Sequence, residues 1–252
     1  MLRSPSIGSE PATPGAVAWP RLKDGLILLG DDSPDSDALA SMLVRATDGT
    51  VVRGRDAVRR AMSASRPGMV VVRTSPRRAP MRHVRMLVRD ASCPVAIAPY
   101  GFGDEAPGVL RRIGVAFDGW TEARGALSEA ARIAEGAGAE LRLLMVGDPH
   151  TAASAEVRDD EGDWMIGHAE AAARYLEPEV AELSRNMRAR GTVLYGQVVP
   201  ALREAARAQR LDLLVLGSRR QGPVARVVLG SVSAALLSEP PCPLLVCPRS
   251  TR

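Results

Sequence analysis

Short apolar runs alternate with longer segments of helical periodicity between residues 113 and 247. Apolar strands that alternate with amphipathic helices require crossover connections, which give a parallel sheet with helices on both faces. One-sided apolar spacing is clearest in segment 121–137, where Thr121 can cap the start and Gly138 can mark the end. This part of the chain is therefore predicted to have an α/β fold with an open, five-stranded parallel sheet.

The bounds of the predicted elements follow from the apolar runs and from the glycines and prolines that interrupt them. Helices are predicted over residues 121–137, 165–190, 200–209 and 231–238. Strands are predicted over residues 113–118, 140–146, 192–198, 211–216 and 243–247. Open α/β sheets bind ligands beyond the carboxyl ends of their strands, so the loops that follow these strands are the places to search for a site.

The loop after strand 211–216 has the composition of a phosphate-binding loop. Gly217 ends the apolar run, two arginines follow, and Gly230 and Ser231 open the next helix. Glycine lets backbone N–H groups approach an anion, and a helix N-terminus favours negative charge. The same residues could also be no more than a turn and a helix start, since serine is a preferred N-cap residue.

The spacing of this loop resembles the Gly-x2-Gly-x9-Gly-Ser/Thr nucleotide loop of the universal stress protein family, with Gly217 first and Gly230-Ser231 last. The resemblance implies a Rossmann-like fold of the adenine nucleotide alpha hydrolase type, with ATP or a related adenine nucleotide as ligand. The implied site consists of Ala116 and Val146 at the adenine, Asp118 at the nucleoside, Leu216 and Gly217 beneath the ribose, and Gly230, Ser231, Val232 and Ser233 at the phosphates. From the residues alone, Asp118 could instead cap the turn into helix 121–137.

Arg220 departs from the family pattern, because it stands where the family has its second glycine. A side chain there blocks close approach of the backbone to phosphate if the position needs a positive φ. Three outcomes stay open. Gly222 takes over the turn, or Arg220 and its neighbouring arginines add charged contacts to the phosphates, or the site is closed.

Two proline-bounded apolar segments indicate an internal repeat. Ser92-Cys-Pro-Val-Ala-Ile-Ala-Pro99 resembles Pro241-Cys-Pro-Leu-Leu-Val-Cys-Pro248, and the match extends upstream, where it pairs Asp31 with Asp118 and Ser75 with Ser218. The predicted organisation is a disordered tail at 1–20, a degenerate unit at 21–100, a linker at 101–109 and a complete unit at 110–252. The degenerate unit lacks one strand–helix pair and the glycine loop. Strands 93–98 and 242–247 are expected to meet and pair the two units within the chain, and a homodimer is an alternative.

The net charge of the chain says little about the kind of partner that it binds. The formal net charge is +4, but Lys23 is the only lysine among 33 basic residues, which indicates a compositional bias toward arginine. The arginine-rich stretch 53–90 is open to two interpretations, a surface for nucleic acid or another acidic partner, or solvated helix faces. An aromatic content of 3% argues against a stacking platform for single-stranded nucleic acid. Neither a nucleic-acid partner nor a membrane partner is expected.

Cysteine and histidine positions argue against a metal site. The three cysteines are odd in number and lack metal-ligand spacing, which suggests a reducing, cytoplasmic location. The three histidines are scattered without acidic or cysteine companions, and nothing independently supports Mg²⁺. No nucleophile–base pair stands out, so no catalytic residue is predicted, although slow ATP hydrolysis stays open.

The leading hypothesis is a stress-response regulatory or signalling module that binds an adenine nucleotide in its C-terminal unit. The second hypothesis is a nucleotide-free scaffold that acts through protein–protein contacts. The third is a basic module that binds polyanions.

Overall fold

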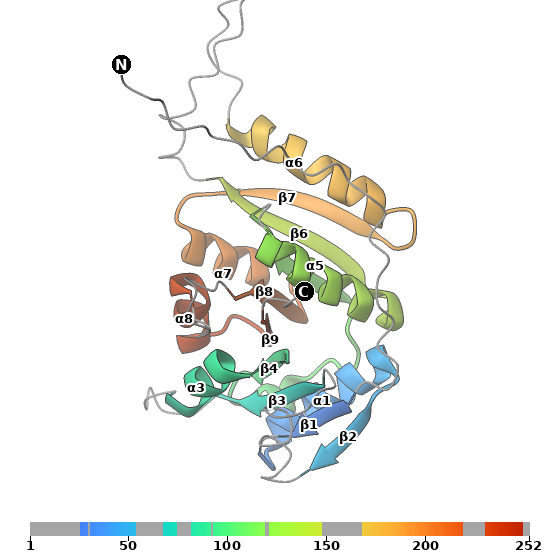
Figure 1. Ribbon diagram of the computed structural model, residues 1–252, viewed down its shortest axis with the longest axis vertical. Coiled ribbons are helices and arrows are strands. Elements are labelled where there is room, and N and C mark those ends of the chain that lie inside the picture. Colours follow the sequence, from blue (N-terminus) through green and yellow to red (C-terminus); the bar gives the residue numbers. More distant parts are fainter. Residues whose placement is uncertain are drawn as a thin grey trace, which may run out of the picture.

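One sheet of nine strands runs through the computed structural model, which describes residues 26–29, 31–53, 68–74, 82–91, 93–118, 121–147, 168–218 and 230–248. The strand order is β2-β1-β3-β4-β9-β8-β5-β6-β7 (Figure 1). The strands are β1 (Leu26–Leu29), β2 (Thr50–Arg53), β3 (Met69–Arg73), β4 (Val95–Ala98), β5 (Arg112–Ala116), β6 (Glu140–Gly147), β7 (Ala189–Tyr195), β8 (Leu213–Gly217) and β9 (Leu244–Cys247). All neighbouring pairs are parallel except β4 and β9.

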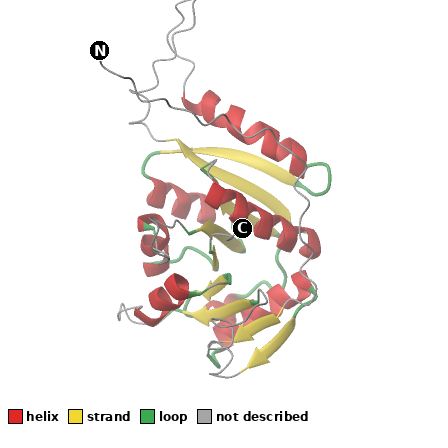
Figure 2. Cartoon of the chain, viewed as in Figure 1, coloured by secondary structure: helices red, strands yellow, loops and turns green. Residues whose placement is uncertain are grey.

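Helices pack on both faces of the sheet (Figure 2). They are α1 (Pro34–Thr47), α3 (Arg82–Asp90), α4 (Phe102–Glu105), α5 (Thr121–Ala137), α6 (His168–Leu183), α7 (Val198–Ala208) and α8 (Ser231–Ser238). Helices α1, α5 and α6 contribute buried side chains to one apolar layer, which includes Leu43, Ile133 and Leu176. Helices α3, α7 and α8 contribute to the other layer, which includes Val84, Leu202 and Leu236. This is the α/β architecture that the alternating sequence pattern predicts.

Local sequence sets the bounds of α1 and α5. Ser33 caps α1, because its Oγ accepts the N–H of Ser36 at 3.2 Å, and Pro34 is the first helical residue. Asp48 ends α1 with a left-handed φ of 50°, and Gly138 follows α5 with a φ of 61°. A left-handed residue after the last turn is a common way to end a helix, and this ending was predicted for α5.

The N-terminal half (β1 to α4) and the C-terminal half (β5 to β9) meet where β4 lies antiparallel to β9. Val95 pairs with Val246, and Ile97 pairs with Leu244. Every residue of both strands is buried, so either strand alone would present an apolar, unpaired edge to water. The apolar layers on both faces contain residues of both halves, and the two halves therefore share one core.

The sheet is larger than the five-stranded sheet predicted from residues 110–252. That region contributes five adjacent strands, but β4 continues the sheet beyond β9. The predicted bounds of α5 and α8 are confirmed. The helix predicted at 165–190 and the strand predicted at 192–198 are both present, but the helix ends seven residues earlier and the strand lies three residues earlier than predicted. Helix α6 ends at Leu183 because the N–H groups of Asn186 and Met187 turn back to its carbonyl at 3.1 and 3.0 Å, with no glycine or proline to signal this end. The other bounds in this region differ by two residues or fewer.

All three cysteines of the chain are free and buried. Burial raises the pKa of Cys93 to about 11. Burial, together with the nearby Asp212 carboxylate, raises the pKa of Cys242 to about 12, and burial raises that of Cys247 well above its usual value. Since the thiolate is the reactive form, these side chains combine restricted access with a low thiolate fraction.

We expect the three thiols of the native protein to react with a disulfide reagent at pH 8 at least ~100-fold more slowly than in the unfolded chain. The measurement is the rate of release of the coloured thiolate from dithionitrobenzoate, with the same protein in guanidinium chloride as control. Three equivalents should react promptly in the denaturant. Rapid labelling of even one native cysteine would contradict the burial described above.

No helix in the described residues is both long and apolar enough to cross a membrane. Within the same residues, no group of three or more histidine, cysteine, aspartate or glutamate side chains is placed to hold a metal ion. The tail predicted at 1–20 lies outside the described residues.

Candidate functional site

The order in which the chain adds strands to the sheet reverses between β5 and β8. From β5 it proceeds outward to β6 and β7, and it then returns to β8 on the other side of β5. Strand β5 is parallel to both of its neighbours, so the carboxyl ends of β6, β5 and β8 lie along one edge. Open α/β sheets bind ligands beyond the carboxyl ends of the strands at such a reversal. We call this place, together with the start of α8, the β5–β8 edge.

Five of the predicted site residues lie at the ends of these three strands. Ala116 is the last residue of β5 and Gly217 the last residue of β8, and both are half-buried. Leu216 precedes Gly217 and is buried. Asp118 follows β5 by two residues and is exposed, and Val146 is half-buried near the end of β6. The structure therefore brings together an exposed carboxylate, a glycine and small or apolar side chains.

The other described site residues form the first turn of α8. Because β8 and β9 are parallel, α8 runs back along the sheet, and its N-terminus lies at the same edge as the end of β8. Gly230 is the N-cap residue and supplies no side-chain cap, and the helix starts with the N–H of Ala234 donating to Gly230 O at 2.9 Å. Ser231 is exposed, Val232 is half-buried and Ser233 is buried. The first backbone N–H groups of α8 have no partner within the helix and can donate to an anion.

Sequence reasoning missed Ser218 as a site candidate. This residue directly follows Gly217 at the end of β8 and is 1% exposed. Its backbone N–H donates to Cys247 O at 2.9 Å, but its buried hydroxyl has no hydrogen-bond partner among the described residues. An unpartnered buried hydroxyl is uncommon and costs free energy. The signal available in the sequence was a polar side chain immediately after the strand-ending glycine.

Arg220 lies outside the described residues, together with the rest of segment 219–229. Whether its guanidinium contacts phosphate or closes the site therefore stays a prediction. Two cavities among the described residues lie at other places. One of about 480 Å³ lies along α7 beside Arg203 and Arg207, and one of about 380 Å³ lies at the amino ends of β6 and β7 beside Glu140 and Arg190.

The N-terminal half has a comparable edge at the carboxyl ends of β1 and β3. Its hydrogen bonds show which of its residues correspond to those at the end of β8. The N–H of Thr74 donates to Ala98 O at 2.9 Å after β3, as the N–H of Ser218 donates to Cys247 O after β8. Thr74 is therefore the counterpart of Ser218, one residue before Ser75, which the sequence comparison had paired with it.

The same register makes Arg73 the counterpart of Gly217. Through the pairing of β1 with β3 and of β5 with β8, it also makes Asp32 the counterpart of Asp118. The predicted pairing of Asp31 with Asp118 was thus wrong by one residue. An apolar run such as Leu26–Leu29 carries no landmark that fixes its register, and only the strand neighbours supply one.

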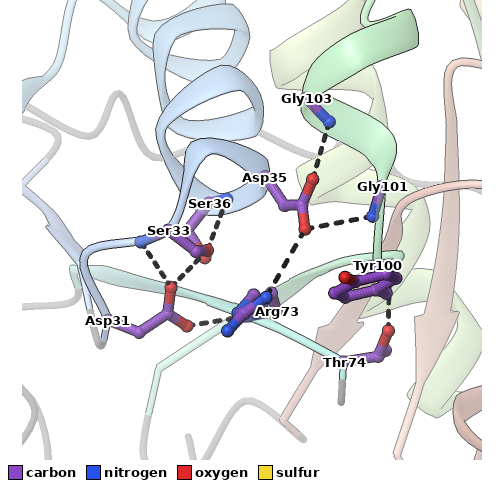
Figure 3. A network of polar contacts seen from close by, with 9 residues as sticks. All are labelled: Asp31, Ser33, Asp35, Ser36, Arg73, Thr74, Tyr100, Gly101 and Gly103. Carbon is purple, nitrogen blue, oxygen red and sulfur yellow. Dashed lines mark hydrogen bonds and ion pairs between the residues drawn. The ribbon is translucent and has the colours of Figure 1, made fainter. Parts of the chain in front are cut away.

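Asp31 points into the N-terminal half and holds the ends of β1 and β3 together (Figure 3). Its Oδ1 accepts the backbone N–H of Ser33 at 3.1 Å and the hydroxyl of Ser33 at 2.5 Å, and its Oδ2 accepts the N–H of Arg73 at 2.9 Å. Burial by itself would raise the pKa of Asp31, but hydrogen bonds from Ser33 and from the Arg73 backbone help to bring that pKa below its usual value. Both oxygens of this carboxylate thus accept hydrogen bonds from the protein itself.

Comparison with known proteins decides the family. The profile of the universal stress protein family matches residues 110–248, which is more than half of the chain. The chain belongs to the universal stress protein family. A universal stress protein of Thermus aquaticus is 31% identical over 144 residues, covering 55% of this chain and 98% of the relative. One of Mycobacterium tuberculosis is 39% identical over 74 residues, and this match spans 29% of this chain but only 23% of the mycobacterial protein.

Solved structures of universal stress proteins share the fold of both halves. The structure from Archaeoglobus fulgidus covers 90% of this chain and 97% of its own, with a TM-score of 0.60 and 16% identity. A universal stress protein structure from Pseudomonas aeruginosa covers 89% of this chain and 82% of its own, with a TM-score of 0.54 and 17% identity. At these identities the likeness establishes the arrangement of the chain and carries no statement about ligands.

Proposed function

We propose that this universal stress protein binds ATP or a related adenine nucleotide at the β5–β8 edge and works as a regulatory module. The observation that carries the proposal is that the exposed Asp118, Gly217 and the start of α8 lie at the same end of the sheet, where the strand order reverses. Family membership supports it, since the spacing from Gly217 to Gly230-Ser231 is that of the family's nucleotide loop apart from Arg220.

The start of α8 suits the phosphates. An uncapped helix N-terminus presents free N–H donors and a partial positive charge, both of which stabilise an anion. The hydroxyl of Ser231 is exposed and can add a hydrogen bond, and Ser233 lies one half-turn further into the helix. Gly230 keeps the approach open, because a Cβ at this position would meet nothing within 4 Å among the described residues.

The ends of β5 and β6 suit the nucleoside. The Asp118 carboxylate can accept hydrogen bonds from ribose hydroxyls or from the adenine amino group. Ala116 and Val146 are half-buried, and they offer small apolar surface next to this carboxylate. Gly217 brings no side chain to the end of β8, whereas its counterpart in the N-terminal half is Arg73.

A binding role is favoured over catalysis by the chemistry of the edge. The described residues at the ends of β5, β6 and β8 and at the start of α8 include no histidine or lysine that could serve as a general base. Three free thiols fit a reducing compartment such as the cytoplasm. The role that follows is a stress-response module whose nucleotide state alters its contacts.

The two-unit organisation belongs to the same proposal. Residues 21–100 would be a degenerate copy of the complete unit at 110–252, and the pairing of β4 with β9 would join them as an internal pseudo-dimer. Supporting observations are the matching hydrogen bonds after β3 and β8 and the strand orders β2-β1-β3-β4 and β6-β5-β8-β9. With β9 paired inside the chain, that edge is no longer free to form a homodimer.

The test is isothermal titration of ATP into the purified chain and two variants. Asp118→Ala and Gly230→Val should each weaken binding at least ~10-fold, a loss of about 1.4 kcal/mol. Valine at position 230 has room in the described structure and fits the extended backbone there (φ −59°, ψ 153°), so its effect reports on the ligand. Asp104→Ala, on the exposed side of α4, is the matched control and should bind like wild type.

Wild-type affinity no tighter than that of both variants would overturn the nucleotide proposal. Arg220→Gly then separates the remaining alternatives. If ATP binds only after this change, the natural chain is a nucleotide-free scaffold. If it does not bind even then, the whole edge has lost the function.

A further inference from the structure

We infer that residues 99–105 are a built-in occupant of the carboxyl edge of the N-terminal half, so that this half is closed to any nucleotide and the chain binds one nucleotide, not two. The closure depends on the contacts of this segment alone. Only the count of nucleotides rests on the proposed function.

Arg73 places a side chain at the position where the C-terminal half has a glycine. It is the counterpart of Gly217, and its guanidinium lies 5.7 Å from the centre of the Tyr100 ring and 4.0 Å from the Asp35 carboxylate (Figure 3). A cation above an aromatic face and beside a carboxylate is held from two sides. The place beside the end of β3 is thus taken by protein side chains, whereas the end of β8 has a glycine.

Asp35 binds the backbone of the occupant segment. This residue is 5% exposed and lies in the first turn of α1. Its Oδ2 accepts the N–H of Gly101 at 3.1 Å, and its Oδ1 accepts the N–H of Gly103 at 2.7 Å. The N-cap of α4 is Gly101, which has no side chain, so Asp35 of α1 performs the capping from outside the helix.

Two further features show that the segment is fitted to this edge. The Oγ1 of Thr74, the counterpart of Ser218, accepts the N–H of Tyr100 at 2.9 Å. Gly101 has a φ of +80°, and a Cβ at Gly103 would lie 3.0 Å from the backbone of Pro34. Glycine is therefore favoured at both positions, at Gly101 by conformation and at Gly103 by close approach.

Further contacts fix the chain between the occupant and β5. Beyond α4, Arg45 of α1 donates to Gly108 O at 2.7 Å. The N–H groups of Arg111 and Arg112 both donate to the Asp212 carboxylate at 2.8 Å. The stretch predicted as a linker at 101–109 is thus fastened to the N-terminal half at one end and followed by a fixed entry into the C-terminal half.

The test is amide hydrogen exchange of the full-length chain, combined with the stoichiometry of ATP binding by equilibrium dialysis. In the wild type, the amides of Gly101 and Gly103 should exchange at least ~100-fold more slowly than in an unfolded chain, with and without ATP. Asp35→Ala should speed exchange in residues 99–105 at least ~10-fold, while peptides from β8 and β9 keep their rates. Asp104→Ala, an exposed carboxylate of α4, is the control and should change neither.

Each outcome bears on a separate claim. Unprotected Gly101 and Gly103 amides in the wild type would overturn the closure even if Asp35→Ala fails to fold, as would faster exchange of 99–105 on addition of ATP. Two nucleotides per chain would overturn it as well. If the wild type binds no ATP, the proposed function fails, and the exchange rates still decide whether the edge is closed.

Discussion

Gly136→Ala is expected to lower the free energy of unfolding by about 3 kcal/mol, because no side chain fits where α5 crosses α1. A Cβ on Gly136 would overlap the carbonyl oxygen of Ala46 and lie 2.9 Å from its carbonyl carbon. Both are backbone atoms, so the conflict cannot be relieved by rotating a side chain. The two helices must move apart, and this opens the apolar layer that they share. The measurement is thermal unfolding by circular dichroism, with the melting temperature about 6–12 °C lower.

Gly125→Ala is the matched control, because it makes the same change in the same helix. A Cβ at Gly125 meets nothing within 4 Å in the part of the chain that the structure describes, so the change acts there through helix propensity. Alanine is favoured over glycine inside a helix by about 0.8–1 kcal/mol, and this variant should therefore be slightly more stable than the wild type. If the two variants shift the melting temperature in the same direction by similar amounts, the close approach of α5 to α1 does not limit stability.

Ile97→Ala is expected to cost about 3 kcal/mol and to destabilise both halves together. Ile97 is fully buried in β4, pairs with Leu244 of β9, and belongs to an apolar layer that also contains Leu236 of α8. Removing its side chain leaves a cavity at the junction of the halves. Because the layer is continuous, we expect one cooperative transition in guanidinium chloride at a lower midpoint. Hydrogen exchange should show β1–β4 and β5–β9 losing protection in parallel.

Val109→Ala is the control for this experiment. Val109 is 40% exposed and is part of neither apolar layer, so its truncation should change stability by no more than ~0.5 kcal/mol. Two separate transitions, with the C-terminal half unaffected by Ile97→Ala, would show that the halves fold independently. The shared core would then not couple them.

Local patterns were sufficient to predict most elements of the C-terminal half. The one-sided apolar spacing of 121–137 and the glycines after it predict α5 to the residue, and Ser231 marks the start of α8. These signals work because caps and periodicity act over a few neighbouring residues. The end of α6 was not predicted, because no capping residue marks it. Its final turn closes through backbone hydrogen bonds to Leu183, and these leave no mark in residue type.

The candidate site was predictable in part. The described site residues Ala116, Asp118, Gly217 and Ser231 lie at one edge, because parallel strands and the helix that follows β8 bring their loops to the same end of the sheet. Ser218 was not singled out, since a single hydroxyl after a glycine becomes notable only when its burial without a partner is seen.

The sequence by itself determined the α/β class, the order of strands and helices in the C-terminal half, and the family to which the chain belongs. Each of these depends on residue type and spacing within short windows. Tertiary structure alone decided the antiparallel junction of β4 with β9, the contact of Gly136 with Ala46, and the closure of the N-terminal edge by residues 99–105. These features join residues far apart in the chain, and their free energy depends on distances that no local pattern encodes.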